Sequence, residues 1–463
     1  MSAAPEAGLP GRPGLARRLV RGGAWALLGR SLGLPAGLIT AVLLARLLSP
    51  AEVGGYFLAM SLITIAAFLA QLGMARPVVK LVASALATGR PEAARHTVRV
   101  ALLTTLAGGA VLALLIADGP GMWLASMLRD GDLLGRVLPL VALLVVAYAL
   151  VDLMAESLRG FHDLRAASFL GDGLAQRLLL AVVLATLWAS AAPLDLATVL
   201  ELSLVNSTLV LLLAGAVLGL RLKALPRHGA RFRTREILEH GPPFLAVRLN
   251  VWLLAGADLW ILGIFRSAEE VAIYGVASRM ALLVGIPLLV VNATLAPAIA
   301  ELYSRGERAR LQAALRAAAT LSTIVSIAVL AVFALLGQAL LEVAFGPAYA
   351  GSFVILVVLG LGQLVNVACG SCTLALTMTG HQRDVLVIAT LVAALTFAAL
   401  FLVAPAFGAP GVAAVIATSL ALYNVALALA VRRRLGLTSW AAADRLHLAG
   451  LLRDLRQAAR FSA

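Results

Sequence analysis

The chain has 463 residues, of which 62% are hydrophobic and 13% are charged, and its mean hydropathy is +0.98. Soluble globular domains average about 45–50% apolar and about 25% charged residues, so this composition excludes a water-soluble fold and predicts a membrane protein. The two cysteines are too few for a disulfide framework, and the Pro/Gly/Arg-rich first twenty residues lack the apolar core of a cleavable signal peptide.

A membrane-spanning helix needs about 20 mostly apolar residues at a rise of about 1.5 Å per residue. Twelve segments meet this requirement, near 22–47, 53–74, 98–118, 136–158, 166–190, 197–220, 243–265, 272–298, 317–337, 353–378, 385–404 and 411–431. We therefore predict an all-α polytopic membrane protein with a basic N-terminus (1–21), a six-helix N-terminal lobe (22–220), a basic loop (221–242), a six-helix C-terminal lobe (243–431) and a basic tail (432–463).

Positive charge is segregated among the expected loops. When each Lys and Arg is assigned to a side of the membrane, 29 of the 37 share the side of the two termini, three lie on the opposite side and five lie within spans. Cytoplasmic loops carry the excess of Lys and Arg, so both termini are expected in the cytoplasm. This segregation argues against a nucleic-acid partner for the net charge of +14. The tail from Arg432 is expected to form a basic amphipathic helix on the inner leaflet, the alternative being a solvated tail.

The two halves of the chain repeat weakly at a spacing of about 218–220 residues. Ser49, Glu52, Val53 and Tyr56 follow the first span as Ser267, Glu270, Val271 and Tyr274 follow the seventh. After six spans the chain is back on the side of the membrane where it began. The second half therefore starts in the same orientation as the first, and the halves are expected to be parallel repeats about an axis along the membrane normal. Transporters built in this way commonly bind their substrate between the repeats.

Several local motifs resemble a known family. The run LARLLSPAEVGGY at 44–56 is similar to the first hairpin of the polysaccharide-exporting flippases, and so are DLWILG at 258–263 and EVAIYG at 270–275. The turn LRGF at 158–161, before the fifth span, is also similar to that family. That family shares a superfamily with multidrug-and-toxin extruders and the peptidoglycan-precursor flippase. The resemblance implies two six-helix bundles around a central cavity. It also implies that the cargo is an oligosaccharide on a polyprenyl pyrophosphate, moved from the inner to the outer leaflet.

Two arginines occupy equivalent places in the first and seventh spans. Arg30 and Arg248 are separated by the repeat spacing, and an ionised side chain at a span centre costs about 2.5–3.5 kcal/mol on insertion scales. Two arginine forks facing one cavity suit a pyrophosphate, because arginine presents bidentate donors and stays charged. We predict that both bind substrate, the alternative being that their side chains snorkel to the inner interface.

Three further charges fall within spans. Asp258 and Arg279 are expected at matching depth on adjacent spans, which favours a salt bridge; alternatively, Asp258 is a proton or cation site that competes with Arg279. Arg177 lies about 16 Å into the fifth span. An ion-pair network with nearby Asp152, Glu156 or Asp172 is favoured for it over cargo contact. Arg279 and Arg177 remain candidate substrate-binding residues, and Asp258 is the candidate for ion coupling.

The sequence favours a transporter over an enzyme. It has no Walker A, HExxH or GxSxG motif, its outer loops are short and its six histidines are scattered, so neither catalytic residues nor a metal site are expected. A multidrug extruder is the first alternative, but only 6% of the residues are aromatic and the paired span charges are basic, which favours an anionic cargo. The second alternative is an integral membrane enzyme of polysaccharide assembly.

These observations predict a flippase of the bacterial inner membrane that works by alternating access. We expect no cofactor, with H⁺ or Na⁺ coupling as the driving force to be tested. Its expected partners are the lipid-linked oligosaccharide, membrane lipids and other polysaccharide assembly proteins.

Overall fold

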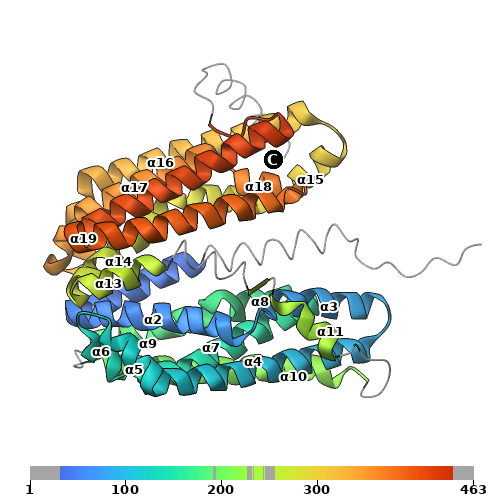
Figure 1. Cartoon of the computed structure of the whole chain (residues 1–463), viewed down its shortest axis with the longest axis horizontal. Helices are drawn as coiled ribbons and strands as arrows, with labels where there is room; N and C mark the ends of the chain where they lie inside the picture. The colour runs from blue at the N-terminus through green and yellow to red at the C-terminus, as the bar shows by residue number, and fades with distance from the viewer. Residues whose placement is uncertain are drawn as a thin grey trace, which may run out of the picture.

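The computed structural model describes residues 32–190, 194–226, 232, 234–242, 244–245 and 256–441, apart from the side chains of Asp172 and Thr294. Within these ranges every regular element is a helix, as the composition predicts. The helices form two elongated bundles, the N-terminal lobe and the C-terminal lobe, which lie alongside each other (Figure 1).

The N-terminal lobe begins with a helix over Leu32–Leu47. Its further helices are α2 (Pro50–Ala70), α3 (Ala75–Ala87), α4 (Pro91–Ala117), α5 (Gly119–Ser126), α6 (Gly131–Gly135), α7 (Leu138–Gly160), α8 (Leu164–Leu170), α9 (Leu174–Ala189), α10 (Leu196–Lys223) and α11 (Thr234–Glu239). The predicted hairpin after the first span is a capping box, in which the Ser49 side chain accepts from the Glu52 N–H and the Glu52 carboxylate accepts from the Ser49 N–H.

The C-terminal lobe begins at α13 (Ala257–Phe265). Its further helices are α14 (Ala268–Ala281), α15 (Ile286–Ser304), α16 (Arg308–Phe345), α17 (Phe353–Cys369), α18 (Cys372–Met378) and α19 (Gln382–Leu435). The Ser267 side chain caps α14 by accepting from the Glu270 N–H at 3.4 Å, as Ser49 caps α2.

The internal repeat is visible in the contacts of the two equivalent glutamates. Glu52 Oε1 accepts from the N–H of Leu196, at the start of α10, at 3.3 Å. Glu270 Oε1 accepts from the N–H of Ala409 at 2.6 Å, directly after the break in α19. A carboxylate at a helix N-terminus satisfies an unpaired N–H and favours the helix dipole. Each glutamate therefore fixes the start of the last span of its own lobe.

Helix α19 contains two spans. An unbroken helix would place Asp384 and Arg434 about 75 Å apart. Arg434 instead donates to the Asp384 carboxylate at 2.8 and 3.0 Å, so the chain has turned back on itself. The turn is at Gly408, whose φ of 55° is a conformation that glycine adopts without strain. The two parts of α19 run in opposite directions in Figure 1.

Within the part of the chain that the structure describes, eight helices are long and apolar enough to cross a membrane, or nine if the bent pair α8–α9 is one span. The first and seventh predicted spans are described only in part, at Leu32–Leu47 and Ala257–Phe265. The prediction of an all-helical polytopic protein is confirmed, and the number twelve stays a prediction. The predicted amphipathic tail beyond Ala441 lies outside the described residues.

The lobes have the polarity that a bilayer requires. Large apolar side chains such as Leu335, Leu402 and Val343 are 82%, 79% and 76% exposed on the outer faces of their helices. Polar groups lie inside instead: Asn206 is buried and donates to the carbonyl of Gln176 on the neighbouring helix at 2.7 Å. The chain is a multi-pass membrane protein.

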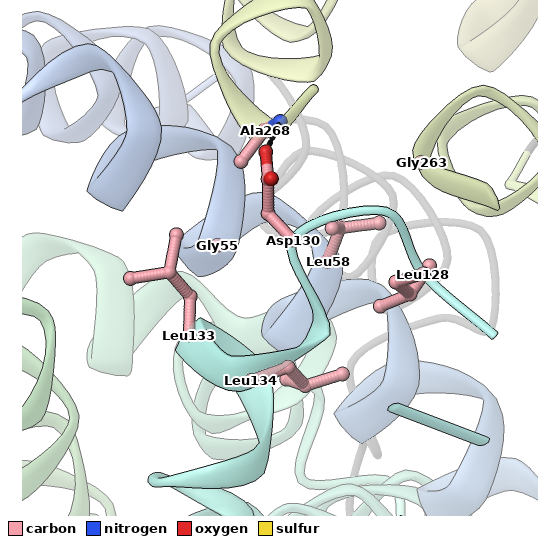
Figure 2. Close-up of a pocket in the computed structure, with 8 residues that line it drawn as sticks. All are labelled: Gly55, Leu58, Leu128, Asp130, Leu133, Leu134, Gly263 and Ala268. Atoms are coloured by element: carbon pink, nitrogen blue, oxygen red, sulfur yellow. Dashed lines mark hydrogen bonds between the residues drawn. The ribbon is translucent and has the colours of Figure 1, made fainter. Parts of the chain in front are cut away.

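The lobes touch at one end of the molecule, where α2, α6, α13 and α14 meet, at the left of Figure 1. We name this region the closed end. The N–H of Ala268 donates to Asp130 Oδ2 at 2.7 Å, and the N–H of Arg129 donates to the carbonyl of Gly263 at 3.0 Å. Figure 2 shows Asp130 reaching from the loop before α6 to the start of α14. Gly54 packs so closely that an added Cβ would lie 1.8 Å from the Ala268 carbonyl oxygen.

Arg46 makes a further contact between the lobes. It lies near the end of the first helix of the N-terminal lobe. Its Nε donates to the carbonyl of Ala344 at 3.0 Å, and its Nη2 donates to the carbonyl of Val343, both in the last turn of α16. A cation there satisfies unpaired carbonyls and favours the helix dipole. This arginine therefore stabilises the end of a helix in the other lobe.

Candidate functional site

A cavity of about 950 Å³ lies between the lobes. It extends from Tyr56 and Tyr274, near the closed end, to Gly33 and Gln71. Its walls come from the first helix, α2, α7 and α9 of one lobe and from α13, α14, α17 and α19 of the other. This volume is at the upper end of the range for small-molecule sites, so the cavity has room for a bulky polar group.

Much of the lining is polar without being charged. Hydroxyl and amide side chains come from both lobes: Thr40, Ser61, Thr64, Gln71, Gln176, Ser278, Gln363 and Ser419. Groups of this kind both donate and accept hydrogen bonds, as sugar hydroxyls do. The common cavity of these side chains follows only from the way the helices are placed.

Arg177 faces the cavity and is exposed to it. Its Nη1 donates to the carbonyl of Gly33 at 3.4 Å, and it forms no salt bridge with any described carboxylate. The favoured ion-pair network is therefore not formed by the described side chains. Glu156 pairs instead with Arg159, and Asp152 accepts from Gln71 Nε2 at 2.9 Å. Arg177 therefore lines the cavity without a salt bridge to a described carboxylate.

Asp258 lines the same cavity from the first turn of α13. Its Oδ2 accepts from the Tyr274 hydroxyl at 2.5 Å, and its Oδ1 accepts from the Leu259 N–H at 2.9 Å. The predicted salt bridge to Arg279 is absent between these two described side chains. Both residues line the cavity, but no salt bridge joins them. Matching depth alone does not predict that Tyr274, on the same helix as Arg279, supplies the donor.

Arg279 instead contacts the other lobe. Its Nη1 donates to the carbonyl of Gly275 at 2.8 Å, and its guanidinium carbon lies 3.6 Å from the centre of the Phe57 ring in α2. Gly275 has no side chain to hold the helices apart, since a Cβ there would lie 2.2 Å from the Phe57 ring. Sequence reasoning missed Phe57, because a phenylalanine in an apolar span has the pattern of an ordinary packing residue.

Two of the five predicted site residues are not placed. Arg30 and Arg248 lie outside the described residues, so their expected convergence stays a prediction. The other three, Arg177, Asp258 and Arg279, line one cavity although they come from spans five, seven and eight. The described lining thus carries two arginines and two aspartates, Asp152 being the second aspartate.

Comparison with known proteins agrees with this architecture. A family model described as polysaccharide biosynthesis protein matches residues 19–303. Among solved structures, an inward-facing multidrug resistance MATE family transporter of the MOP superfamily is similar, with a TM-score of 0.69 and 16% identity over 88% of this chain and 94% of that one. An outward-facing structure of such a transporter gives a TM-score of 0.57 at 16% identity, over 91% and 96% of the two chains.

The lipid II flippase MurJ, in an inward closed conformation, has a TM-score of 0.67 and 13% identity, over 88% of this chain and 87% of that one. A sequence comparison with curated proteins finds no match. The similarity to solved structures concerns the fold, whereas the family model covers more than half of the chain. The chain therefore belongs to the polysaccharide biosynthesis protein family, and it has the fold of the transporters and flippases of the MOP superfamily.

Proposed function

We propose that the protein moves a polyprenyl-pyrophosphate-linked oligosaccharide from the inner to the outer leaflet of a bacterial cytoplasmic membrane. The observation that carries this proposal is the guanidinium of Arg177, which faces a cavity lined by hydroxyl and amide groups and lacks a described carboxylate partner. Arginine binds phosphate oxygens in a bidentate manner, and the neutral polar lining suits sugar hydroxyls. Membership of a polysaccharide biosynthesis family supports the same class of cargo.

The proposed transport is alternating access between two lobes. The excess of cytoplasmic Lys and Arg predicted from the sequence makes the closed end the outer end. In this conformation the cavity then serves the cytoplasmic side, and the greater similarity to an inward-facing transporter supports this orientation. Cargo enters from the inside, its lipid tail stays in the bilayer, and separation of the lobes at the closed end exposes the head group to the outside.

Asp258 is our proposed site of coupling to an H⁺ or Na⁺ gradient. It is an aspartate in the cavity wall without a direct salt bridge among the described side chains, and its main partner is the neutral hydroxyl of Tyr274. Ionisable groups inside a membrane protein are functional candidates by default, because their insertion is costly.

A multidrug extruder is the second candidate. Aromatic rings at Tyr56, Phe57, Tyr148 and Tyr423 line the cavity together with its two aspartates, and such rings attract organic cations. The overall aromatic content of the sequence did not reveal this local concentration. The lining thus offers groups for both kinds of cargo, and the charge of the transported molecule separates the two proposals.

The decisive experiment uses proteoliposomes. One arm measures flipping of a fluorescent polyprenyl-pyrophosphate oligosaccharide, with and without a pH gradient, and a second arm measures uptake of a cationic dye. We expect flipping in the first arm. We also expect Arg177→Ala to reduce the rate of flipping about 10- to 150-fold, because the substitution removes a charge-assisted hydrogen bond to the cargo of about 1.5–3 kcal/mol. Arg308→Ala is the control, because Arg308 is exposed at the start of α16. Dye uptake without lipid flipping would overturn the flippase proposal in favour of the extruder.

A further inference from the structure

Arg279 belongs to two sites at once. Its guanidinium lines the cavity, where cargo is proposed to bind, and it also lies over the Phe57 ring of the opposite lobe. A cation over an aromatic face is held by the ring quadrupole, more strongly where water is excluded. Phe57 is only 1% exposed, so this contact is largely dry. The contact links α14 of the C-terminal lobe to α2 of the N-terminal lobe between the closed end and the cavity.

The contact exists only while the lobes are together. The Phe57 ring occupies the space beside Gly275, where a Cβ would lie 2.2 Å from ring carbon Cδ2. Phe57 lies on α2 of one lobe and Arg279 on α14 of the other, so separation of the lobes at the closed end would take the ring away from the guanidinium. The contact therefore reports and stabilises the conformation in which the closed end is shut.

The remaining partner of Arg279 is weak. Among the described residues its guanidinium donates to one carbonyl, that of Gly275, and forms no salt bridge with a carboxylate. Asp258 lies near enough to attract its charge but accepts its side-chain hydrogen bond from Tyr274. A phosphate or pyrophosphate in the cavity offers several anionic oxygens at once. Bidentate, charge-assisted hydrogen bonds are stronger than a cation–π contact, so we expect such an anion to compete with the Phe57 ring for the guanidinium.

We propose that Arg279 couples cargo binding to lobe separation: an anionic cargo group draws the guanidinium away from Phe57 and thereby weakens the closed end. The inference rests on the proposed function for the charge of the cargo. Phe57 is then a positioning residue, which acts on cargo only through Arg279. A ligand shifts an equilibrium by its differential affinity for the two states, and this coupling is reciprocal. Removing the ring should therefore separate the lobes and tighten anion binding together.

Binding to the full-length protein in nanodiscs tests the inference. The probe is geranylgeranyl pyrophosphate, and geranylgeraniol, which has the same tail without the anion, is the matched control ligand. We expect Phe57→Leu to lower the Kd for the pyrophosphate about two- to thirty-fold, the range of cation–π strengths, and to leave the Kd for the alcohol unchanged. Phe57→Tyr keeps the ring and should keep the wild-type Kd. Phe333→Leu, a buried substitution within the C-terminal lobe, is the control for packing loss.

Lobe separation is measured in the same samples. Spin labels on Asp132→Cys and Glu269→Cys, both exposed near the closed end, report the distance between the lobes. We expect the pyrophosphate to increase this distance in the wild-type protein and Phe57→Leu to increase it without ligand. Phe57→Met serves as a second ring-free variant if Phe57→Leu does not fold.

Unchanged or weaker pyrophosphate binding by the ring-free variants, with wild-type distances, would overturn the inference while leaving the proposed function intact. If the wild-type protein binds the alcohol and the pyrophosphate with equal Kd, both this inference and the proposed function are wrong.

Discussion

Replacing Gly54 by alanine is expected to open the closed end. In the structure an added Cβ lies 1.8 Å from the carbonyl oxygen of Ala268 in the other lobe, and the obstacle is backbone that cannot rotate away. The lobes must move apart by more than an ångström to accept the methyl group, whereas each lobe keeps its own packing. Overpacking of this kind costs about 1–3 kcal/mol, so we expect the equilibrium to shift about 5- to 150-fold toward separated lobes.

The neighbouring glycine provides the matched control. A Cβ on Gly55 would meet the end of the Leu196 side chain at 2.9 Å, within the same lobe, and a flexible side chain moves out of the way at low cost. Gly55→Ala should therefore leave the separation of the lobes unchanged. Both substitutions add one methyl group to adjacent positions of α2, so any difference between them comes from the lobe interface.

Pulsed electron paramagnetic resonance between labels at Asp132→Cys and Glu269→Cys measures the separation. The two native cysteines, Cys369 and Cys372, are buried and unpaired, so replacing both by alanine gives a clean background. We expect a longer mean distance for Gly54→Ala than for Gly55→Ala. Identical distance distributions in a folded Gly54→Ala protein would refute the argument that this backbone contact holds the closed end shut.

Three further substitutions test individual contacts. Asp130→Ala removes the carboxylate that accepts from the Ala268 N–H at 2.7 Å, and it should weaken the contact between the lobes at the closed end by about 1.5–3 kcal/mol. The same pair of spin labels measures the effect, and an unchanged distance between the labels would show that this hydrogen bond does not hold the lobes together. Glu270→Ala removes the cap on Ala409 and should destabilise the C-terminal lobe by about 0.5–2 kcal/mol in thermal unfolding; an unaltered melting temperature would contradict this. Asp258→Asn should abolish the dependence of transport on the pH or Na⁺ gradient without loss of folded protein, and gradient-dependent transport by this variant would exclude the coupling role.

Some site residues could be predicted because their placement depends on depth along a span. The number of residues from a span end fixes a side chain's height in the membrane. Arg177, Asp258 and Arg279 could therefore be singled out as charges within spans, and all three line the cavity. The partners of these residues could not be predicted, because several side chains lie at the same depth in the membrane. Which of them come into contact depends on the rotation of each helix and on how the lobes pack together.

Composition and residue pattern determined that the chain is an all-helical, multi-pass membrane protein, because the length and hydrophobicity of a span are local properties of the sequence. Only the tertiary structure decided that Tyr274 donates to Asp258, that Phe57 packs against Arg279 and that Arg177 lines the cavity. These partners come from different helices, and Phe57 and Arg279 come from different halves of the chain. Their meeting depends on how closely two bundles approach at Gly54 and Gly275, a distance that no local pattern encodes.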